Sequence, residues 1–355
     1  MVYLAVLHAR LQGKVPVIAA GRNAHKTFLS AVALTDAQVT WLYPARQESY
    51  LSCPVTAADV QALGEDVTAL YLTSPDYLGN MVDIAAISQV CRQKGILLMV
   101  DNAHGAYLRF LPESLHPVDL GADLCCDSAH KTLPVLTGGA YLHVAHTDLL
   151  PYATNALALF GSTSPSYLIL QSLDAVNPYL AEGYREKLAA FVQRLEETKA
   201  RLSQFTFCGQ EPMKMTIQAK ACGYTGTQMA DSLRQQGVEC EFADPDYVVL
   251  MPTPEMDEAA LLRLEAALSA IPVRQSIATP PPVFAGAQRV CSVRQAMLSP
   301  WEWVPVEESE GRVLAAATVG CPPAVPILVS GERIDANAIA CFRYYHIQTC
   351  AVVKE

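Results

Sequence analysis

The sequence of 355 residues lacks several features that would place it in large classes of proteins. It contains no apolar run of about 18 residues, so no segment is predicted to span a membrane. Its first residues lack the basic leader of a signal peptide. A net charge of −10 argues against binding to a phosphate backbone. We therefore expect a cytoplasmic protein that binds neither membranes nor nucleic acids.

Cysteine is present, but not in the patterns typical of disulfide frameworks or metal centres. The 11 cysteines are scattered without a C-x-x-C pair, and Cys125 and Cys126 are adjacent in a predicted buried strand. We expect reduced core thiols and no metal site.

The composition, 51% hydrophobic and 17% charged, is typical of a well-packed globular chain. Its length indicates two or three compact units.

What the sequence does contain is an alternation of strands and helices over its first half. Thr56 is predicted to cap a helix that ends near Leu63. Residues 83–94 place apolar side chains on one face of a helix that stops at Gly95. Hydrophobic runs predict strands at 15–19, 39–42, 67–72, 96–100, 124–126 and 139–144. Strand, helix and strand in this order form a parallel βαβ unit, so we predict an α/β fold with a mostly parallel sheet.

The second half of the chain is predicted to form two smaller units. A long amphipathic helix at 184–205 would link them to the large domain. Residues 279–283 contain three consecutive prolines and form a stiff linker. Strand, helix, strand and helix are predicted in turn at 213–219, 225–236, 247–251 and 256–271. We therefore expect three parts: a large domain at 1–183, a small α+β domain at 184–278, and a C-terminal subdomain at 279–355.

Two of the predicted strands end in polar clusters that suit one cofactor. The strand at 96–100 is followed by Asp101, and the strand at 124–126 leads to Lys131. Side chains at the carboxyl ends of such strands line the ligand crevice of an α/β sheet. Pyridoxal 5'-phosphate (PLP) requires a lysine for its Schiff base and an acidic partner for its pyridinium nitrogen. The plainer alternatives are a surface lysine and an aspartate that caps a loop.

The motifs around these two residues resemble the Orn/Lys/Arg decarboxylase family, PLP enzymes of the aspartate-aminotransferase-like fold (fold type I). Ser-x-His-Lys also occurs in other fold-type-I enzymes, such as cysteine desulfurases, so no single motif decides the resemblance. The motifs occur in the family's order and cover nearly the whole chain. They are Gly21-Arg-Asn-Ala-His-Lys26, Asp101-Asn-Ala-His-Gly105, Ser128-Ala-His-Lys131, Ser162-Thr-Ser-Pro-Ser-Tyr167 and residues 321–332.

The resemblance implies a role for each candidate catalytic residue. Lys131 would hold PLP, and Asp101 would pair with its pyridine nitrogen. Ala103 would lie against one face of the ring. His25 would stack on the other face and take part in proton transfer. Attack on an aldehyde requires Lys131 to be neutral, and burial or a neighbouring cation would lower its pKa.

Further residues are implied to complete the cofactor site. Ser128 and His130 would surround the phosphate and the ring. His104 would face the substrate or hydrogen-bond locally. One or more of the hydroxyls of Ser162, Thr163 and Ser164 would reach the phosphate of a partner subunit, in a homodimer with shared active sites. A turn that caps the next helix explains these hydroxyls nearly as well.

By resemblance, the predicted reaction is decarboxylation of arginine, lysine or ornithine to agmatine or a diamine and carbon dioxide. Family members carry a Gly-Ser-Thr type loop that cradles the phosphate before the first helix. Here Met1 falls inside that helix, so we expect an N-terminally truncated short form. Two alternatives stay open. One is an inactive homologue that only folds and dimerises, and the other is a different fold-type-I activity, such as desulfuration or transamination.

Overall fold

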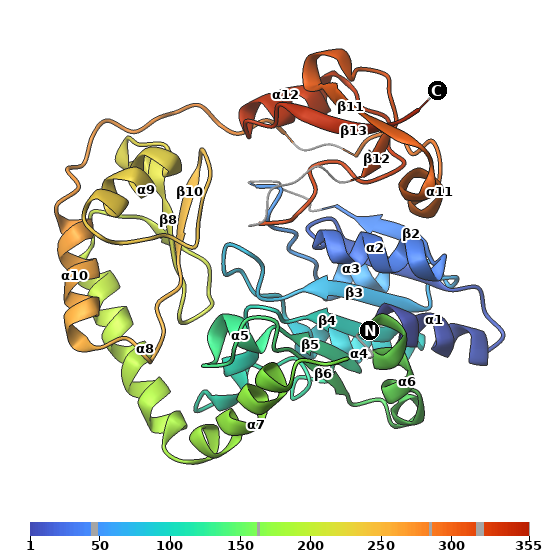
Figure 1. The fold of residues 1–355 in the computed structure, drawn as a ribbon, viewed down its shortest axis with the longest axis horizontal. Helices are drawn as coiled ribbons and strands as arrows, with labels where there is room; N and C mark the ends of the chain where they lie inside the picture. The colour runs from blue at the N-terminus through green and yellow to red at the C-terminus, as the bar shows by residue number, and fades with distance from the viewer. Residues whose placement is uncertain (44–48, 162–163, 284–285, 317–322, 355) are drawn as a thin grey trace.

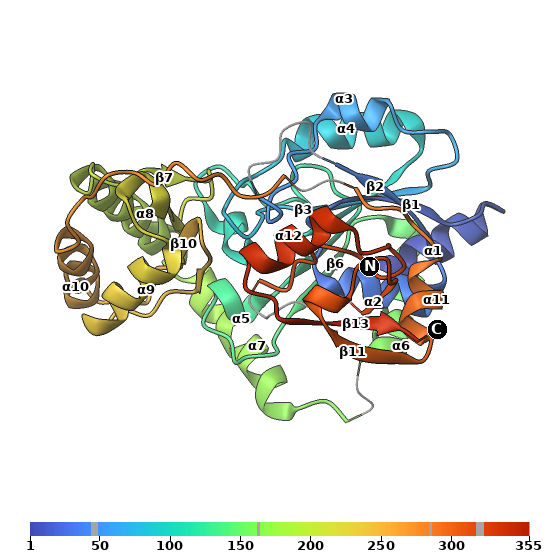
Figure 2. The same cartoon turned by 90° about the horizontal axis from the view of Figure 1, so that it is seen from above.

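The computed structural model describes residues 1–43, 49–161, 164–283, 286–316 and 323–354 (Figure 1). These residues form three sheets, each packed with its own helices. In Figure 1 the unit with the four-stranded sheet lies to the left of the six-stranded sheet. The unit with the three-stranded sheet lies above the six-stranded sheet. Figure 2, seen from above, places this last unit over the large sheet and its helices.

The large unit contains one mostly parallel sheet, as the sequence predicts. Its strands lie in the order β2 (Gln38–Leu42), β1 (Val17–Gly21), β3 (Ala69–Thr73), β4 (Leu97–Asp101), β5 (Leu124–Asp127) and β6 (Tyr141–Val144). The pairs from β2 to β5 are parallel, and the edge strand β6 runs antiparallel to β5. The central strands are almost fully buried, which is typical of a parallel sheet covered on both faces. The predicted α/β class is confirmed.

Alternate residues of each central strand pack against different helices. Ile18 and Tyr71 belong to the core under α1 (Val2–Leu11), α2 (Lys26–Thr35) and α6 (Leu150–Phe160). Val17 and Leu70 belong to the opposite core under α3 (Ala57–Gln61) and α4 (Ile84–Lys94). Because side chains alternate along a strand, this arrangement separates the polar residues at the strand ends into two groups.

Local capping explains two helices that the sequence predicts. The Thr56 side chain accepts a hydrogen bond from the Asp59 N–H, and the Asp59 carboxylate accepts one from the Thr56 N–H, which completes a capping box for α3. Asp83 caps α4, and Gly95 ends it at a φ of 65°, where glycine is favoured. Boundaries elsewhere shift by a few residues: β1 begins two residues later than predicted, at Val17.

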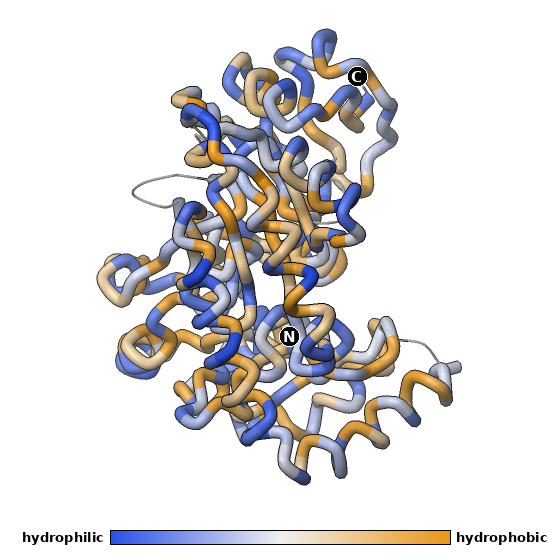
Figure 3. Tube along the Cα trace, turned by 90° about the vertical axis from the view of Figure 1, so that its left-hand side faces the viewer, coloured by the Kyte–Doolittle hydropathy of each residue, from blue (hydrophilic) through white to orange (hydrophobic). Residues whose placement is uncertain are grey.

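The sequence analysis missed α6 and named the next helix, α7 (Tyr167–Ala181), only as an alternative explanation of the Ser162–Ser164 hydroxyls. Helices α6 and α7 lead from the large unit to the small one. Many of their apolar side chains are exposed, so they lack the one-sided pattern that identifies a surface helix. These exposed side chains are Leu150, Leu157, Leu159, Phe160, Tyr167, Leu168 and Leu170. Figure 3 colours α7 largely as hydrophobic at the edge of the molecule. Within the described part of the chain, no helix is long and apolar enough to cross a membrane.

The small unit has the strand, helix, strand, helix series that the sequence predicts. It follows α8 (Tyr184–Arg201) and contains β8 (Met215–Gln218), α9 (Gly226–Gln235), β10 (Tyr247–Leu250) and α10 (Glu258–Ser269). The antiparallel sheet also has edge strands β7 (Phe207–Cys208) and β9 (Phe242–Ala243), each two residues long. Runs this short carry no detectable alternation, so the sequence analysis did not find them.

The C-terminal unit has a three-stranded antiparallel sheet. Its elements are α11 (Val293–Leu298), β11 (Trp301–Pro305), β12 (Leu314–Ala316), α12 (Ala336–Tyr344) and β13 (Thr349–Val353), with β13 between the other strands. The cysteines within the described ranges are all free thiols, as expected. Cys321 lies outside the described residues.

A buried ion pair joins the two ends of the chain. Arg22, in the loop after β1, lies 3.2 Å from the Glu332 carboxylate, and both side chains are almost completely buried. Arg22 also donates to the carbonyls of Pro326 and Ile327, each at 3.0 Å. Two motifs that are about 300 residues apart in the sequence therefore meet here.

Replacing Glu332 with Ala should lower the free energy of unfolding by about 3–5 kcal/mol, because it removes the carboxylate that balances the buried Arg22 charge. The matched control is Glu239→Ala, which breaks an exposed pair with Arg234 and should leave the free energy of unfolding nearly unchanged. Urea denaturation of the three proteins measures both changes. Equal losses in the two variants would contradict a structural role for the buried pair.

Candidate active site

The site is built at the carboxyl ends of β4 and β5. Asp101 is the last residue of β4, and its Oδ2 accepts a hydrogen bond of 2.7 Å from the buried Tyr71 hydroxyl. Its Oδ1 accepts the Ala103 N–H at 3.1 Å and the Cys126 thiol at 3.8 Å. The Tyr71 ring packs 4.3 Å from that of Phe28. Asp101 is therefore a buried carboxylate fixed by several donors.

Lys131 lies on the short helix α5 (Ala129–Thr132) that follows β5. Its Nζ is 3.2 Å from Nε2 of His104, a fully buried imidazole. Burial lowers the pKa of His104 well below its ordinary value, and the nearby cations of Lys214 and Lys131 lower it further. His104 is therefore a neutral imidazole that accepts a hydrogen bond from the Lys131 amine. Within the described structure, its Nδ1 atom has no hydrogen-bond partner.

His25 stands at the start of α2, where its Nδ1 accepts the Thr27 N–H at 3.2 Å. Burial lowers the pKa of His25, the Asp101 carboxylate opposes this shift, and the Lys131 cation adds to it. His25 therefore lies within electrostatic range of both residues, although they come from different parts of the chain. The structure brings His25, Asp101 and Lys131 together, along with Ala103 and His104.

The other predicted residues have separate surroundings. Ser128 is the N-cap residue of α5 but makes no capping hydrogen bond. His130 donates from Nδ1 to the Gly139 carbonyl at 2.8 Å, so its ring is held within its own unit. Ser164 is exposed before α7, and Thr163 lies outside the described residues.

Sequence reasoning missed Tyr71 and Asn102. Thr73 of β3 lies opposite Asp101, so Tyr71, two residues earlier, shares a face with the carboxylate. Strand register would have been needed to find it. Asn102, next to Asp101, donates to Oδ1 of Asp127 at 2.7 Å. This hydrogen bond connects the ends of the two strands that carry the site.

A buried polar group from the small unit also reaches this region. Lys214 donates from Nζ to the carbonyls of Asp76 and Tyr77 in the large unit, at 3.0 and 3.2 Å. The Tyr77 ring lies 5.0 Å from that of His104. Burial lowers the pKa of Lys214 to about 8, although Glu211 and Asp76 oppose the shift. The sequence carries no signal for this contact, because it depends on how the two units pack.

Comparison with known proteins identifies the family of this chain. Sequence models of the Orn/Lys/Arg decarboxylase major domain and C-terminal domain match residues 4–259 and 287–352. The chain belongs to the Orn/Lys/Arg decarboxylase family. Family members are PLP-dependent lyases, so the predicted enzyme class and cofactor are confirmed.

Curated relatives and solved structures agree with this assignment. The chain is 29% identical to the uncharacterized protein YaaO of Bacillus subtilis, over 90% of this chain and 71% of the relative. It is 28% identical to an arginine decarboxylase of Bacillus anthracis, over 91% of this chain and 71% of the relative. The constitutive lysine decarboxylase of Escherichia coli shares the fold, with a TM-score of 0.75 and 15% identity, over 99% of this chain and 68% of that one.

The residues present fit the cofactor of this family. A buried carboxylate at Asp101 suits a protonated pyridine nitrogen, and the Lys131 amine suits an aldehyde. The unpartnered Nδ1 of the buried His104 indicates a place for a further polar atom, because such groups are rarely left unsatisfied. Ala103 adds only a methyl group beside these residues.

Replacing Tyr71 with Phe should lower the free energy of unfolding by about 1.5–3 kcal/mol, because the buried Asp101 carboxylate loses a charge-assisted hydrogen bond. The control is Tyr167→Phe, since Tyr167 is 82% exposed and should be insensitive. Chemical denaturation measures the difference. A Tyr71 variant as stable as the wild type would show that the hydroxyl does not support Asp101.

Lys214 should make stability depend on pH in alkaline solution. Its pKa falls from 10.5 to about 8 on folding, so between these values the unfolded chain binds more protons than the folded one. The free energy of unfolding should therefore rise with pH across this window. In Lys214→Met, denaturation at a series of pH values should show this rise reduced. Parallel curves for the two proteins would contradict the lowered pKa.

Proposed function

We propose that this chain decarboxylates a basic amino acid, with arginine the first substrate to test. The observation that carries the proposal is the contact of 3.2 Å between Nζ of Lys131 and the neutral imidazole of His104, beside the buried Asp101 carboxylate. Arginine is favoured because a curated relative named arginine decarboxylase matches 91% of the chain. Lysine and ornithine remain the other candidates.

PLP, when bound, supplies a cationic ring that takes up the electron pair left behind as carbon dioxide departs. Asp101 would keep the ring nitrogen protonated, and the Tyr71 hydroxyl and the Ala103 N–H keep this carboxylate in place. Ser128, without a capping bond, would offer its hydroxyl to the phosphate.

Proton transfer would depend on the two histidines of the site. His104, kept neutral by burial, would accept a hydrogen bond from the Lys131 amine through Nε2 and so hold this amine in position. His25 has a lowered pKa, so it is neutral near pH 7 and can take up a proton and return it to the substrate carbon. Replacing the lost carboxylate by this proton balances the reaction.

We also propose a homodimer in which Ser164 approaches the partner subunit's site. The exposed apolar side chains of α6 and α7 support this proposal, because isolated proteins rarely leave so many together in water. Ser164 lies between these two helices in the chain, within the same segment.

Replacing Lys131 with Ala should reduce release of carbon dioxide by at least about 10³-fold, because the amine that holds PLP is lost. The measurement uses carboxyl-labelled arginine, lysine and ornithine with added PLP. Lys14→Ala is the control, since this lysine is exposed on the loop after α1. Borohydride reduction and peptide mapping should locate PLP on Lys131 in the wild type.

The same experiment separates the alternatives. PLP fixed on Lys131 without carbon dioxide release from any of the three substrates would contradict the decarboxylase and favour another PLP reaction. Failure to bind PLP at all would favour the non-catalytic homologue.

A further inference from the structure

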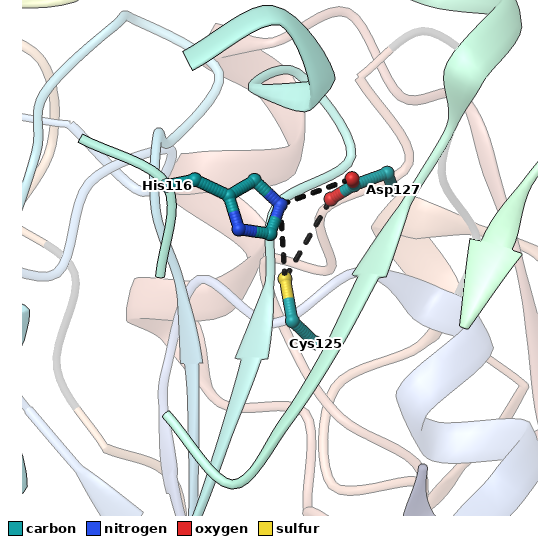
Figure 4. A group of neighbouring side chains, drawn as sticks. All are labelled: His116, Cys125 and Asp127. Carbon is teal, nitrogen blue, oxygen red and sulfur yellow. Dashed lines mark hydrogen bonds and ion pairs between the residues drawn. The ribbon is translucent and has the colours of Figure 1, made fainter. Parts of the chain in front are cut away.

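A second cluster of reactive side chains lies at the edge of the large sheet, on the other face from Asp101. Cys125 and Asp127 are two residues apart on β5 and so share a face. His143 of β6 is directly opposite Cys125 in the antiparallel pair. His116 reaches the cluster from the loop before β5. Figure 4 shows the side chains of His116, Cys125 and Asp127 converging.

The three side chains in Figure 4 have the spacing of metal ligands. Nε2 of His116 lies 3.1 Å from Oδ2 of Asp127 and 4.0 Å from Sγ of Cys125. Sγ of Cys125 lies 3.6 Å from Oδ1 of Asp127. Around tetrahedral zinc, with bonds of about 2.0 Å to nitrogen or oxygen and 2.3 Å to sulfur, ligand atoms stand about 3.3–3.6 Å apart. Shifts of a few tenths of an ångström would bring these atoms to that spacing.

The carboxylate already has partners that would orient it toward an ion. Asn102 donates to Oδ1 of Asp127 at 2.7 Å, and Nε2 of His143 lies 2.8 Å from its Oδ2. Hydrogen bonds of this kind hold ligating carboxylates in place at established metal sites. A cavity of about 370 Å³ is lined by His116, Asp127 and His143. It offers a route of entry and room for water as a fourth ligand.

We propose that His116, Cys125 and Asp127 bind a divalent ion of the zinc class. A thiolate and an imidazole prefer zinc or cobalt to the harder magnesium and calcium. The sequence analysis expected no metal site, because the cysteines are scattered without a C-x-x-C pair. The cluster becomes visible only through the turn before β5 and the alternation along the strand. The proposal is independent of PLP and of the reaction proposed above.

Binding has a cost that limits its expected strength. Without an ion, Nδ1 of His116 accepts the Val118 N–H at 3.3 Å, so Nε2 carries the proton and donates to Asp127. Coordination through Nε2 requires the proton to move to Nδ1 and the segment 116–118 to shift. The Cys125 thiol must also lose its proton. We therefore expect affinity in the micromolar range, weaker than that of closed structural zinc sites.

The test is titration of the chelator-treated, full-length protein with Co²⁺, whose bond to a thiolate gives a charge-transfer band in the near ultraviolet. The wild type should saturate at one equivalent, and Zn²⁺ should displace the band. Cys125→Ser should lose the band. Cys126→Ser is the matched control, because this neighbour lies on the other face of the strand, against Asp101, and should retain the band.

A second variant keeps the test decisive if Cys125→Ser does not fold. His116→Gln can still donate a hydrogen bond to Asp127, and it should weaken Co²⁺ binding by at least tenfold while its circular dichroism stays unchanged. No band in the wild type, or a band that survives in Cys125→Ser, would overturn the proposal. A band lost in Cys126→Ser and retained in Cys125→Ser would likewise overturn it, since the ion would then use another thiol.

Discussion

The buried pair between Arg22 and Glu332 is the constraint on which the arrangement of this chain depends. The Arg22 guanidinium is almost completely buried, and it binds the Glu332 carboxylate and two backbone carbonyls from the last quarter of the chain. The Lys26 N–H, at the start of α2, also donates to the Ala324 carbonyl at 2.8 Å. The loop that presents His25 is therefore held from both sides. The C-terminal unit therefore helps to fix the loop that carries His25 in the candidate active site.

The period of two residues along a strand explains why two groups of polar residues coexist at one sheet edge. Asp101 and Cys126 belong to the face under α2, with Tyr71. Asn102 and Asp127 belong to the other face. Neighbouring residues of the same strand therefore face the proposed cofactor site on one side of the sheet and the proposed ion site on the other. The two sites are linked by the hydrogen bond from Asn102, which follows Asp101, to Asp127.

The sequence was sufficient for features that depend on local pattern, and insufficient for those that depend on packing. Asp101 and Lys131 could be found because each follows an apolar run, and α4 because Asp83 and Gly95 mark its ends. Helix α6 could not be found and the bounds of α7 could not be predicted, since their exposed apolar side chains leave no polar face to define a stripe. Tyr71 required the register of two strands. Lys214 required the docking of two units, which no local pattern encodes.

The buried Lys214 has a consequence for motion. Its ammonium group belongs to the small unit, yet both of its carbonyl acceptors belong to the loop of Asp76 and Tyr77 in the large unit. Thr216 adds a hydrogen bond of 2.9 Å to the Leu78 carbonyl in the same loop. Swinging the units apart would break all three bonds at once. These hydrogen bonds therefore resist a hinge motion between the two units and hold the Tyr77 loop, which packs on His104, against the small unit.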